Sequence, residues 1–301
     1  MTPTLCEPES MSSAVSAAAN ILPAAGTLPI DFATAVRLLA EGDLEELGVI
    51  PWSSNYALLV RVRCDKAADV LPAAGVLPVA GVLPAAGDLP QELYTVYKPR
   101  RGERPLWDFP AGTLYLREYA AFLVSQALGW MLVPPTVLRK GSRGPGTFQV
   151  YIDSDPEQHY FNVLPDHADD YRRVALFDVV INNADRKAGH CLLDASDHIW
   201  SIDHGICFHV EPKLRTVIWD FAGEPIPHAM LDDLNRLSAQ LASTQPLAEN
   251  PSGLSPLGRS LTRLLHRTEV QALRYRLDDL IAGAHFPYPD PNRRNHPWPP
   301  I

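Results

Sequence analysis

Two stretches decide the interpretation of this chain, Ile181-Asn-Asn-Ala-Asp-Arg-Lys-Ala-Gly-His190 and Trp200-Ser-Ile-Asp-His-Gly205. The first follows an apolar helix pattern at 171–181 and precedes a short strand pattern, so we expect a loop held between rigid elements. The second places Asp203 directly after a strand pattern and before a glycine. A carboxylate at such a strand end projects into the space beyond the sheet, where Mg²⁺ can bridge it to phosphate oxygens.

The first loop offers several groups for chemistry. Asp185 can orient or deprotonate an attacking hydroxyl, and His190 can face a metal bound to a triphosphate. Asn182, Asn183 and Arg186 add hydrogen-bond donors. The alternative is a polar turn whose Asn and Asp side chains satisfy local backbone groups, and an Asp-x-Gly turn after a strand occurs in many folds.

A lysine and a glutamate upstream complete the pattern. Lys98 ends a strand pattern at 93–98, and Glu118 lies in a helix pattern at 116–128 that stops at Gly129. A strand lysine paired with a helix glutamate is how kinases fix an ammonium against nucleotide phosphates, although most Lys/Glu pairs are solvated surface charges. The order of these residues and the two later aspartates favours the functional interpretation.

The remaining elements form a strand-rich N-terminal half and a helix-rich C-terminal half. Lys140–Gly146 is rich in glycine, but it lacks a phosphate-loop motif and is expected to be a hairpin turn between strands. The other predicted elements are a helix from 31 with Asp31 as its N-cap, strands at 44–50, 56–64, 136–139, 147–152, 191–193 and 199–202, and helices near 228–243 and 255–283.

Composition narrows the function classes. The 301 residues carry 26 Lys+Arg and 35 Asp+Glu, a net charge of −9, which argues against nucleic-acid binding and against anionic lipid. No run of 18 apolar residues exists, so no stable membrane insertion is expected. The N-terminus carries acidic residues where a signal peptide is basic, and the four cysteines form no CxxC pair. A cytoplasmic location is expected.

Low-complexity segments surround the patterned regions. Leu-Pro-x-Ala-Gly-x repeats recur from Leu71, and we expect residues 67–90 to be an inserted loop because three contiguous copies are too few to form a β-helix. Residues 1–29 are expected to be a disordered tail, and residues 285–301 an extended one.

Six segments carry a resemblance to known proteins: Val96–Pro99, Gly102–Pro110, Arg117-Glu118, Asn183–His190, Ile202–Gly205 and Lys213–Trp219. In these the chain resembles the phosphatidylinositol 3/4-kinase-related, HipA-like group of atypical kinases, in particular a mainly actinobacterial family of phosphatidylinositol-kinase-like proteins. The resemblance spans roughly residues 44–225, apart from the insert, and with the C-terminal helices it covers most of the chain.

The resemblance implies an α+β, two-lobed protein-kinase-like fold, with a β-rich lobe at 30–152 and a helical lobe at 153–284. It implies a phosphotransferase that uses ATP with Mg²⁺ or Mn²⁺ and passes the γ-phosphoryl group to a hydroxyl. The net charge favours a protein or small polar metabolite as acceptor over a lipid. A nucleotide-binding pseudokinase and an AMP-transferring member of the same fold are the alternatives.

The resemblance also implies a role for each matched position. Lys98 contacts the α/β-phosphates and Glu118 holds it, Asp185 is the catalytic aspartate with Arg186 beside it, and Asp203 and His190 bind the metal. The residues expected to bind nucleotide are Ser53, Ser54, Asn55, Lys98 and Gln149.

Two departures from the kinase pattern keep the pseudokinase alternative open. His190 stands where related kinases have a metal-binding Asn, and imidazole suits Mn²⁺ better than Mg²⁺. The turn at Ser53-Ser-Asn55 lacks the glycine that lets backbone amides approach phosphates.

Two other groupings have plainer interpretations. His190, Cys191, His204 and Cys207 could form a zinc quartet, but adjacent strand residues point to opposite faces. The aromatic residues Trp107, Phe109 and Trp219 are expected to pack between the lobes.

Overall fold

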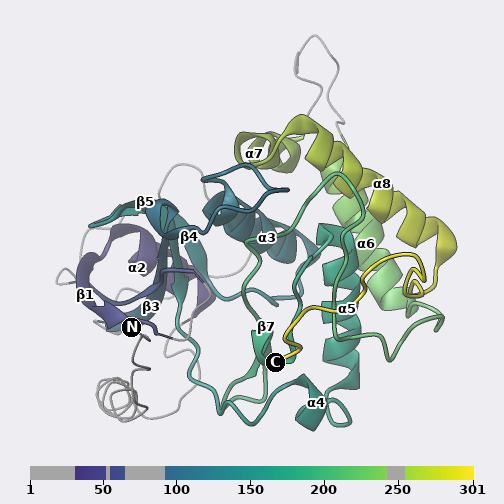
Figure 1. Cartoon of the computed structure of the whole chain (residues 1–301), viewed down its shortest axis with the longest axis horizontal. Helices are drawn as coiled ribbons and strands as arrows, with labels where there is room; N and C mark the ends of the chain where they lie inside the picture. The colour runs from purple at the N-terminus through teal and green to yellow at the C-terminus, as the bar shows by residue number, and fades with distance from the viewer. Residues whose placement is uncertain (1–30, 52–54, 65–91, 243–254) are drawn as a thin grey trace, which may run out of the picture.

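Five antiparallel strands, in the order β1-β2-β3-β5-β4, form the sheet of the N-terminal lobe (Figure 1). The computed structural model describes residues 31–51, 55–64, 92–242 and 255–301, so Ser53, Ser54, the repeats and the N-terminal tail lie outside the described residues. The elements of this lobe are α2 (Phe32–Glu41), β1 (Asp43–Val49), β2 (Leu58–Arg63), β3 (Glu92–Pro99), η1 (Arg100–Gly102), α3 (Leu114–Leu128), β4 (Thr136–Gly141) and β5 (Gly144–Val150).

The C-terminal lobe is built around helices, with one two-stranded sheet. Its elements are α4 (Tyr160–Val163), α5 (Ala168–Ile181), η2 (Ala188–His190), β6 (Cys191–Leu193), β7 (Ile199–Ser201), α6 (His228–Leu241), α7 (Pro256–Leu264) and α8 (Arg267–Gly283). This is the two-lobed, kinase-like α+β fold that the resemblance implied. Among the described helices, none is long and apolar enough to cross a membrane.

Local signals in the sequence explain several element ends. The Asp31 carboxylate accepts a hydrogen bond from the Thr34 N–H at 3.0 Å and caps α2, and Gly129 ends α3 in the left-handed conformation with φ of 74°. The glycine-rich stretch after Arg139 is the predicted hairpin, with Gly141 paired to Gly144. These predictions are confirmed.

The single helix predicted near 255–283 is wrong, because the structure has two helices there. Leu265 is extended, with ψ of 157°, and interrupts the pattern between α7 and α8. His266 then caps α8, and the Glu269 side chain accepts the His266 N–H at 2.9 Å to complete a capping box. Histidine is not among the usual N-cap residues, so the break left little signal in the sequence.

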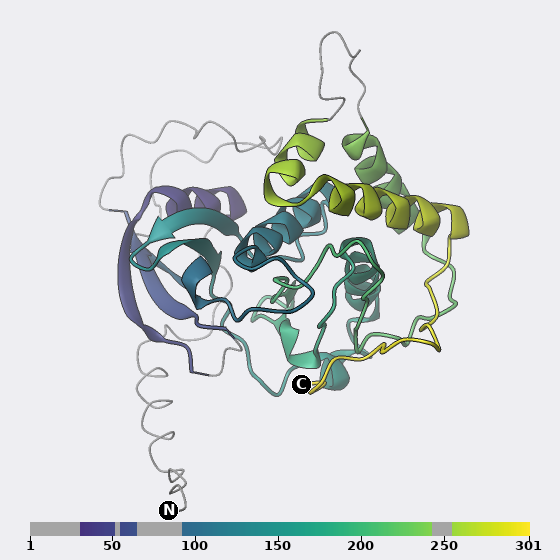
Figure 2. The ribbon, with the colours of Figure 1, turned by 45° about the horizontal axis from the view of Figure 1, so that its top comes forward.

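Helix α3 connects the two lobes. It packs against β4 and β5 of the sheet and against α6 and α7 of the C-terminal lobe (Figure 2). Its buried Arg117 donates to the Cys207 carbonyl at 2.7 Å and pairs with Glu269 of α8 at 2.6 Å. Both partners belong to the C-terminal lobe. These contacts therefore determine the position of the next residue of α3, Glu118, relative to that lobe.

The segment after α8 runs back over the C-terminal lobe (yellow in Figure 2). The Asn295 carbonyl accepts hydrogen bonds from the Thr216 N–H at 3.0 Å and the Trp219 indole at 3.2 Å. The Pro300 carbonyl accepts the Ala188 N–H at 2.8 Å. The segment thereby supports the loop that contains Asp185 from outside.

Strand β5 approaches β3 closely beside Lys98. Gly146 of β5 is paired with Pro99, and a Cβ at Gly146 would lie 2.4 Å from the Lys98 carbonyl oxygen. A real Cβ does not approach a backbone oxygen so closely, so only glycine permits this spacing of the strands beside Lys98.

We therefore expect Gly146→Ala to lower the free energy of unfolding by about 1–3 kcal/mol, because strand β5 must move away from β3. Gly48→Ala in β1 is the matched control, since a Cβ there meets nothing within 4 Å, and its effect should stay below about 0.5 kcal/mol. Urea unfolding followed by circular dichroism measures both. Equal stability of the two variants would contradict the close approach.

Candidate active site

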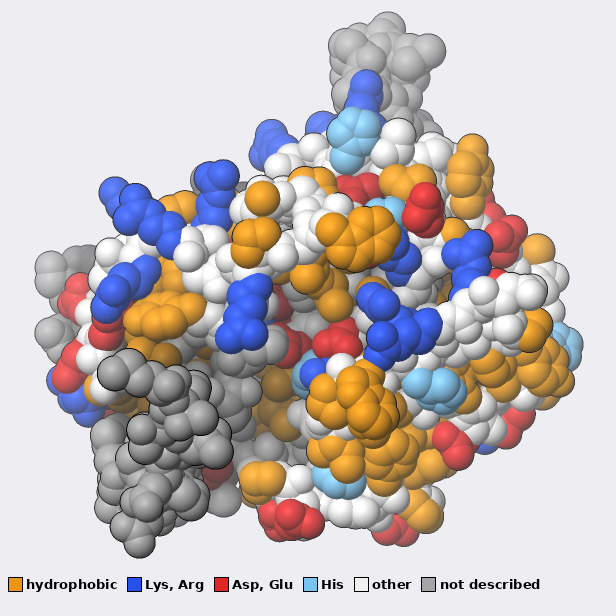
Figure 3. Space-filling view, viewed as in Figure 1, with side chains coloured by type: hydrophobic (Ala, Val, Ile, Leu, Met, Phe, Trp, Pro, Cys, Tyr) orange, Lys and Arg blue, Asp and Glu red, His pale blue; other side chains and the backbone are white. Residues whose placement is uncertain are grey.

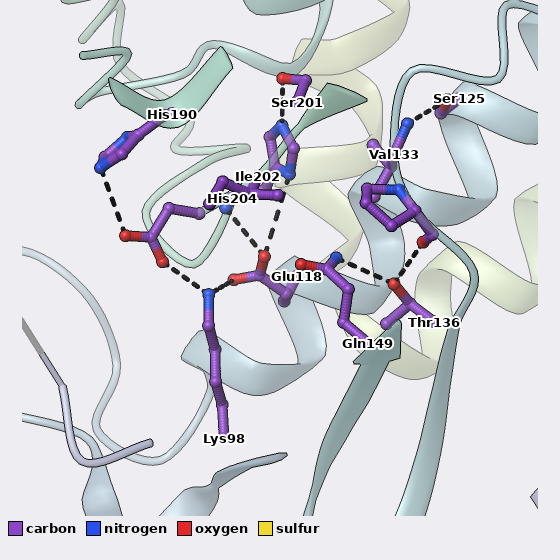
Figure 4. Close-up of polar contacts among 12 residues, drawn as sticks. Lys98, Glu118, Ser125, Val133, Thr136, Gln149, His190, Ser201, Ile202 and His204 are labelled. Carbon is purple, nitrogen blue, oxygen red and sulfur yellow. Dashed lines mark hydrogen bonds and ion pairs between the residues drawn. The ribbon is translucent and has the colours of Figure 1, made fainter. Parts of the chain in front are cut away.

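Lys98, the penultimate residue of β3, lies between two carboxylates from distant parts of the chain (Figure 4). Its Nζ lies 2.5 Å from Oδ1 of Asp203, after β7, and 3.3 Å from Oε2 of Glu118 in α3. Glu118 uses its other oxygen, Oε1, to accept the His204 N–H at 3.1 Å. The three ionised side chains join the sheet, α3 and the loop after β7 at one point.

The electrostatics of this group keep it ionised. Burial by itself lowers the pKa of the Lys98 ammonium, but Asp203 and Glu118 outweigh it and the pKa is raised. Burial raises the pKa of Asp203, yet the charge of Lys98 dominates and holds that pKa well below its ordinary value. Both groups are therefore charged at neutral pH.

Asp185 follows a left-handed turn at the end of α5. Asn182 caps that helix with φ of 53°, and the Asp185 N–H donates to the Asn183 side chain at 3.0 Å. Lys187 Nζ is 3.7 Å from the Asp185 carboxylate. Burial is the main cause that raises the pKa of the Asp185 carboxyl, which makes it a better proton acceptor.

His190 presents an unprotonated nitrogen to Asp203. Its Nδ1 is 3.0 Å from the Asp185 carbonyl oxygen, which only accepts, so Nδ1 carries the ring proton. Burial lowers the pKa of His190 to about 4, which leaves the ring neutral and Nε2 with a free lone pair. That Nε2 faces Oδ2 of Asp203 at 3.4 Å. Two facing acceptors at this distance suit a cation between them.

Five of the eight predicted site residues that the structure describes line one cleft of about 230 Å³. Asn55, Lys98, Glu118, Asp185 and Asp203 all line it. Asn55 is also fixed in place, because its Oδ1 accepts the Arg104 N–H at 3.0 Å.

Three predicted residues in the described part of the chain do not line this cleft. Gln149 is buried in β5 and donates to the Thr136 hydroxyl at 2.9 Å (Figure 4), and His190 and Arg186 likewise do not line the cleft.

Arg186 is completely buried and holds the surrounding loops together. It pairs with the buried Asp178 of α5 at 3.0 Å, and its Nη1 donates to the carbonyls of His190 at 3.2 Å and Ile202 at 2.9 Å. Its Nη2 lies 2.7 Å from Nε2 of His204. Arg186 therefore bridges the two backbone segments that carry His190 and Asp203.

Sequence reasoning missed the partners of Arg186. Asp178 is the one charged residue in the apolar run 174–181, and the sequence suggests no role for His204 beyond the disfavoured zinc quartet. A charged residue at an otherwise apolar helix position was the only signal available for Asp178.

Two other predictions can be compared with the structure. The described residues contain no group of three or more His, Cys, Asp or Glu side chains arranged for a metal, so the disfavoured zinc quartet is absent there. The prediction that Trp107 packs between the lobes is wrong, because its side chain is 93% exposed. Phe109 takes the buried position, under the Arg117 guanidinium at 4.9 Å.

The fold is of the two-lobed, kinase-like type, and comparisons with known proteins identify the family of the chain. The chain is 36% identical over 297 residues to Protein Rv2133c of Mycobacterium tuberculosis (strain ATCC 25618 / H37Rv), a match covering 87% of this chain and 94% of that protein. The chain belongs to the family of Protein Rv2133c. No family model matches it.

Two more distant similarities concern kinases. A segment of 132 residues is 31% identical to phosphatidylinositol 4-kinase gamma 4 of Oryza sativa subsp. japonica and covers 36% of this chain but only 23% of that protein. Among solved structures, the Helicobacter pylori proinflammatory kinase CtkA aligns over 82% of this chain and 94% of its own, with a TM-score of 0.40 and 11% identity.

The burial of Arg186 leads to a prediction about the stability of the fold. Arg186→Ala should lower the free energy of unfolding by about 3–5 kcal/mol, because it leaves the buried Asp178 without its partner. Lys187→Ala, at the neighbouring and partly exposed position, should cost about 1 kcal/mol or less. Urea unfolding measures both. An Arg186→Ala variant as stable as the Lys187→Ala control would contradict the supporting role.

Proposed function

We propose that this protein is an ATP-dependent and divalent-metal-dependent phosphotransferase of the kinase-like class. It passes the γ-phosphoryl group to a hydroxyl of a protein or a small polar metabolite. One observation carries the proposal. Lys98 at the end of β3, Glu118 in α3, Asp185 after α5 and Asp203 after β7 line one cleft, in the order and on the element types that kinases use.

Each group has a task in the transfer. Lys98 binds the α- and β-phosphates of the nucleotide, and Glu118 holds its ammonium in place. Asp185 orients the acceptor hydroxyl and takes its proton as the acceptor oxygen bonds to the γ-phosphorus. The bond from that phosphorus to the β–γ bridging oxygen breaks, and ADP leaves. Most of the rate enhancement comes from positioning and charge neutralisation.

The residues around Asp203 fit a divalent cation. The His190 and Asp203 donor atoms are 3.4 Å apart, the separation of neighbouring ligands on one small ion whose bonds measure about 2.0–2.2 Å. The other ring nitrogen of His190 donates to a backbone carbonyl, which is the usual support of a metal-binding histidine. His190 and Asp203 would supply two ligands to such an ion, and oxygens of phosphate and water would supply the others. When bound, the ion neutralises phosphate charge.

The second candidate function is a pseudokinase that binds nucleotide without transferring phosphate. The observation that favours it is His190, whose imidazole stands where related kinases have an amide oxygen. A weaker Mg²⁺ site lowers turnover without removing the cleft.

Asp185→Asn and Asp203→Asn should separate transfer from binding. We expect Asp185→Asn to lose phosphoryl transfer by about 10²-fold or more while ATP still raises the melting temperature, because Asp185 touches the acceptor and not the nucleotide. Asp203→Asn should lose the metal-dependent part of that stabilisation. Calorimetric melting with ATP and Mg²⁺ or Mn²⁺, together with γ-labelled ATP, measures both.

The controls in this experiment distinguish the alternatives. ATP at a hundred times its dissociation constant adds about 2.7 kcal/mol of stability, enough to be seen on melting. Stabilisation without movement of the γ-label supports the pseudokinase, and movement of an α-label supports AMP transfer. The absence of any nucleotide effect on the wild-type protein would overturn the proposal.

His190→Asn tests the unusual ligand directly. The variant replaces a nitrogen ligand with an amide oxygen, so Mg²⁺ should support nucleotide binding better and Mn²⁺ should lose its advantage. The ratio of nucleotide affinities measured with Mn²⁺ and with Mg²⁺ should therefore fall. An unchanged ratio would mean that His190 does not bind the metal.

A further inference from the structure

The segment that joins β3 to α3 carries unusual side chains to the mouth of the cleft. Trp107 is 93% exposed, the most exposed large hydrophobic residue in the described part of the chain. Arg100, Arg101 and Arg104 are also exposed. Arg104 lines the cleft together with Asp185, whereas Arg101 and Trp107 lie outside that lining. A surface therefore continues from the catalytic aspartate onto the outside of the molecule.

The backbone beside the exposed indole is anchored by its neighbours. Lys213 Nζ lies 5.2 Å from the centre of the Trp107 ring and 3.0 Å from the carboxylate of Asp108. Phe109 is buried and meets the His209 ring edge-on at 5.3 Å. These contacts anchor the two residues that follow Trp107. An aromatic side chain on an anchored backbone gives a partner a large contact area at a small cost in conformational entropy.

The three arginines carry charge without compensation. Within the residues that the structure describes, no carboxylate pairs with Arg100, Arg101 or Arg104, although the chain as a whole has a net charge of −9. Elsewhere on the sheet, Arg61 and Arg63 each contact Glu45 and Glu92. Figure 3 shows Lys and Arg side chains on both sides of a hollow in which acidic side chains are exposed. The mouth is therefore complementary to a negatively charged partner.

We infer that residues 100–107 are the docking surface for the acceptor, and that this acceptor is a peptide segment with acidic residues beside its hydroxyl. The inference rests on the proposed function. A compact metabolite inside the cleft does not account for Trp107, because the indole lies outside the cleft lining. A ligand that reaches both Asp185 and Trp107 has to be extended, as a peptide is. The acidic residues of this peptide lie against the three arginines, and its backbone lies against the indole of Trp107.

Direct binding tests the inference without requiring phosphoryl transfer. Three fluorescein-labelled peptides of equal length contain one serine flanked by Asp and Glu, by Ala and Gly, or by Lys. Fluorescence anisotropy on the full chain should give at least tenfold tighter binding for the acidic peptide than for the other two. Added salt should weaken that binding.

Two pairs of variants locate the surface. Trp107→Ala and Arg101→Glu should each weaken binding of the acidic peptide by about tenfold, equivalent to about 1.4 kcal/mol. The controls are Tyr275→Ala on α8 and Arg236→Glu on α6, away from residues 100–107. Tyr275 is 62% exposed and the Arg236 side chain is 58% exposed, and both variants should leave binding unchanged. All four variants should keep the melting shift with ATP.

The outcomes separate this inference from the proposed function. Equal binding of the three peptides, binding that Trp107→Ala and Arg101→Glu leave intact, or selective binding to vesicles containing anionic lipid instead would each overturn the docking surface. The melting shift with ATP is measured in the same samples. If that shift is present and peptide selectivity is absent, only the inference fails, and if the shift is absent, the proposed function fails.

Discussion

The ammonium of Lys98, placed between the carboxylates of Glu118 and Asp203, is the interaction on which the cleft depends. Glu118 is almost completely buried, and an unpaired carboxylate there would cost several kcal/mol. The pairing is satisfied only when β3, α3 and the loop after β7 meet at one place. The position of the sheet relative to the C-terminal lobe is thereby tied to the arrangement of the charged groups.

A chain of buried polar groups extends this constraint to the loop that contains Asp185. Asp178 pairs with Arg186, Arg186 contacts His204, and the backbone of His204 donates to Glu118. Apolar side chains in these positions could slide past one another at little cost, whereas each hydrogen bond here accepts only a narrow geometry. The network therefore specifies how the loop containing Asp185 sits relative to α3, and a loss at any member leaves its neighbour buried without a partner.

The sequence predicted the groups whose positions follow from local patterns, and missed those set by distant contacts. Lys98, Glu118, Asp185 and Asp203 stand at element ends or in a clear helix pattern, so spacing was informative, and the structure brings all four to one cleft. The pair of Arg117 and Glu269 joins residues 152 positions apart, and no local pattern indicates it. The break before α8 escaped notice because its cap is His266.

Hydrophobicity alone predicted a buried position for Trp107, but the residue lies exposed near the mouth of the cleft. Two residues later, Phe109 fills the buried position, and Lys213 Nζ lies 5.2 Å from the centre of the exposed indole. The carboxylates of Glu118, Asp185 and Asp203 in the cleft repel an incoming polyanion within a Debye length of about 8 Å. The arginines at the mouth oppose that repulsion. Arg104 lines the cleft, so in the proposed function it contacts both nucleotide and acceptor. Trp107 has no charge and lies outside the lining, so its effect on an acceptor can be measured apart from nucleotide capture.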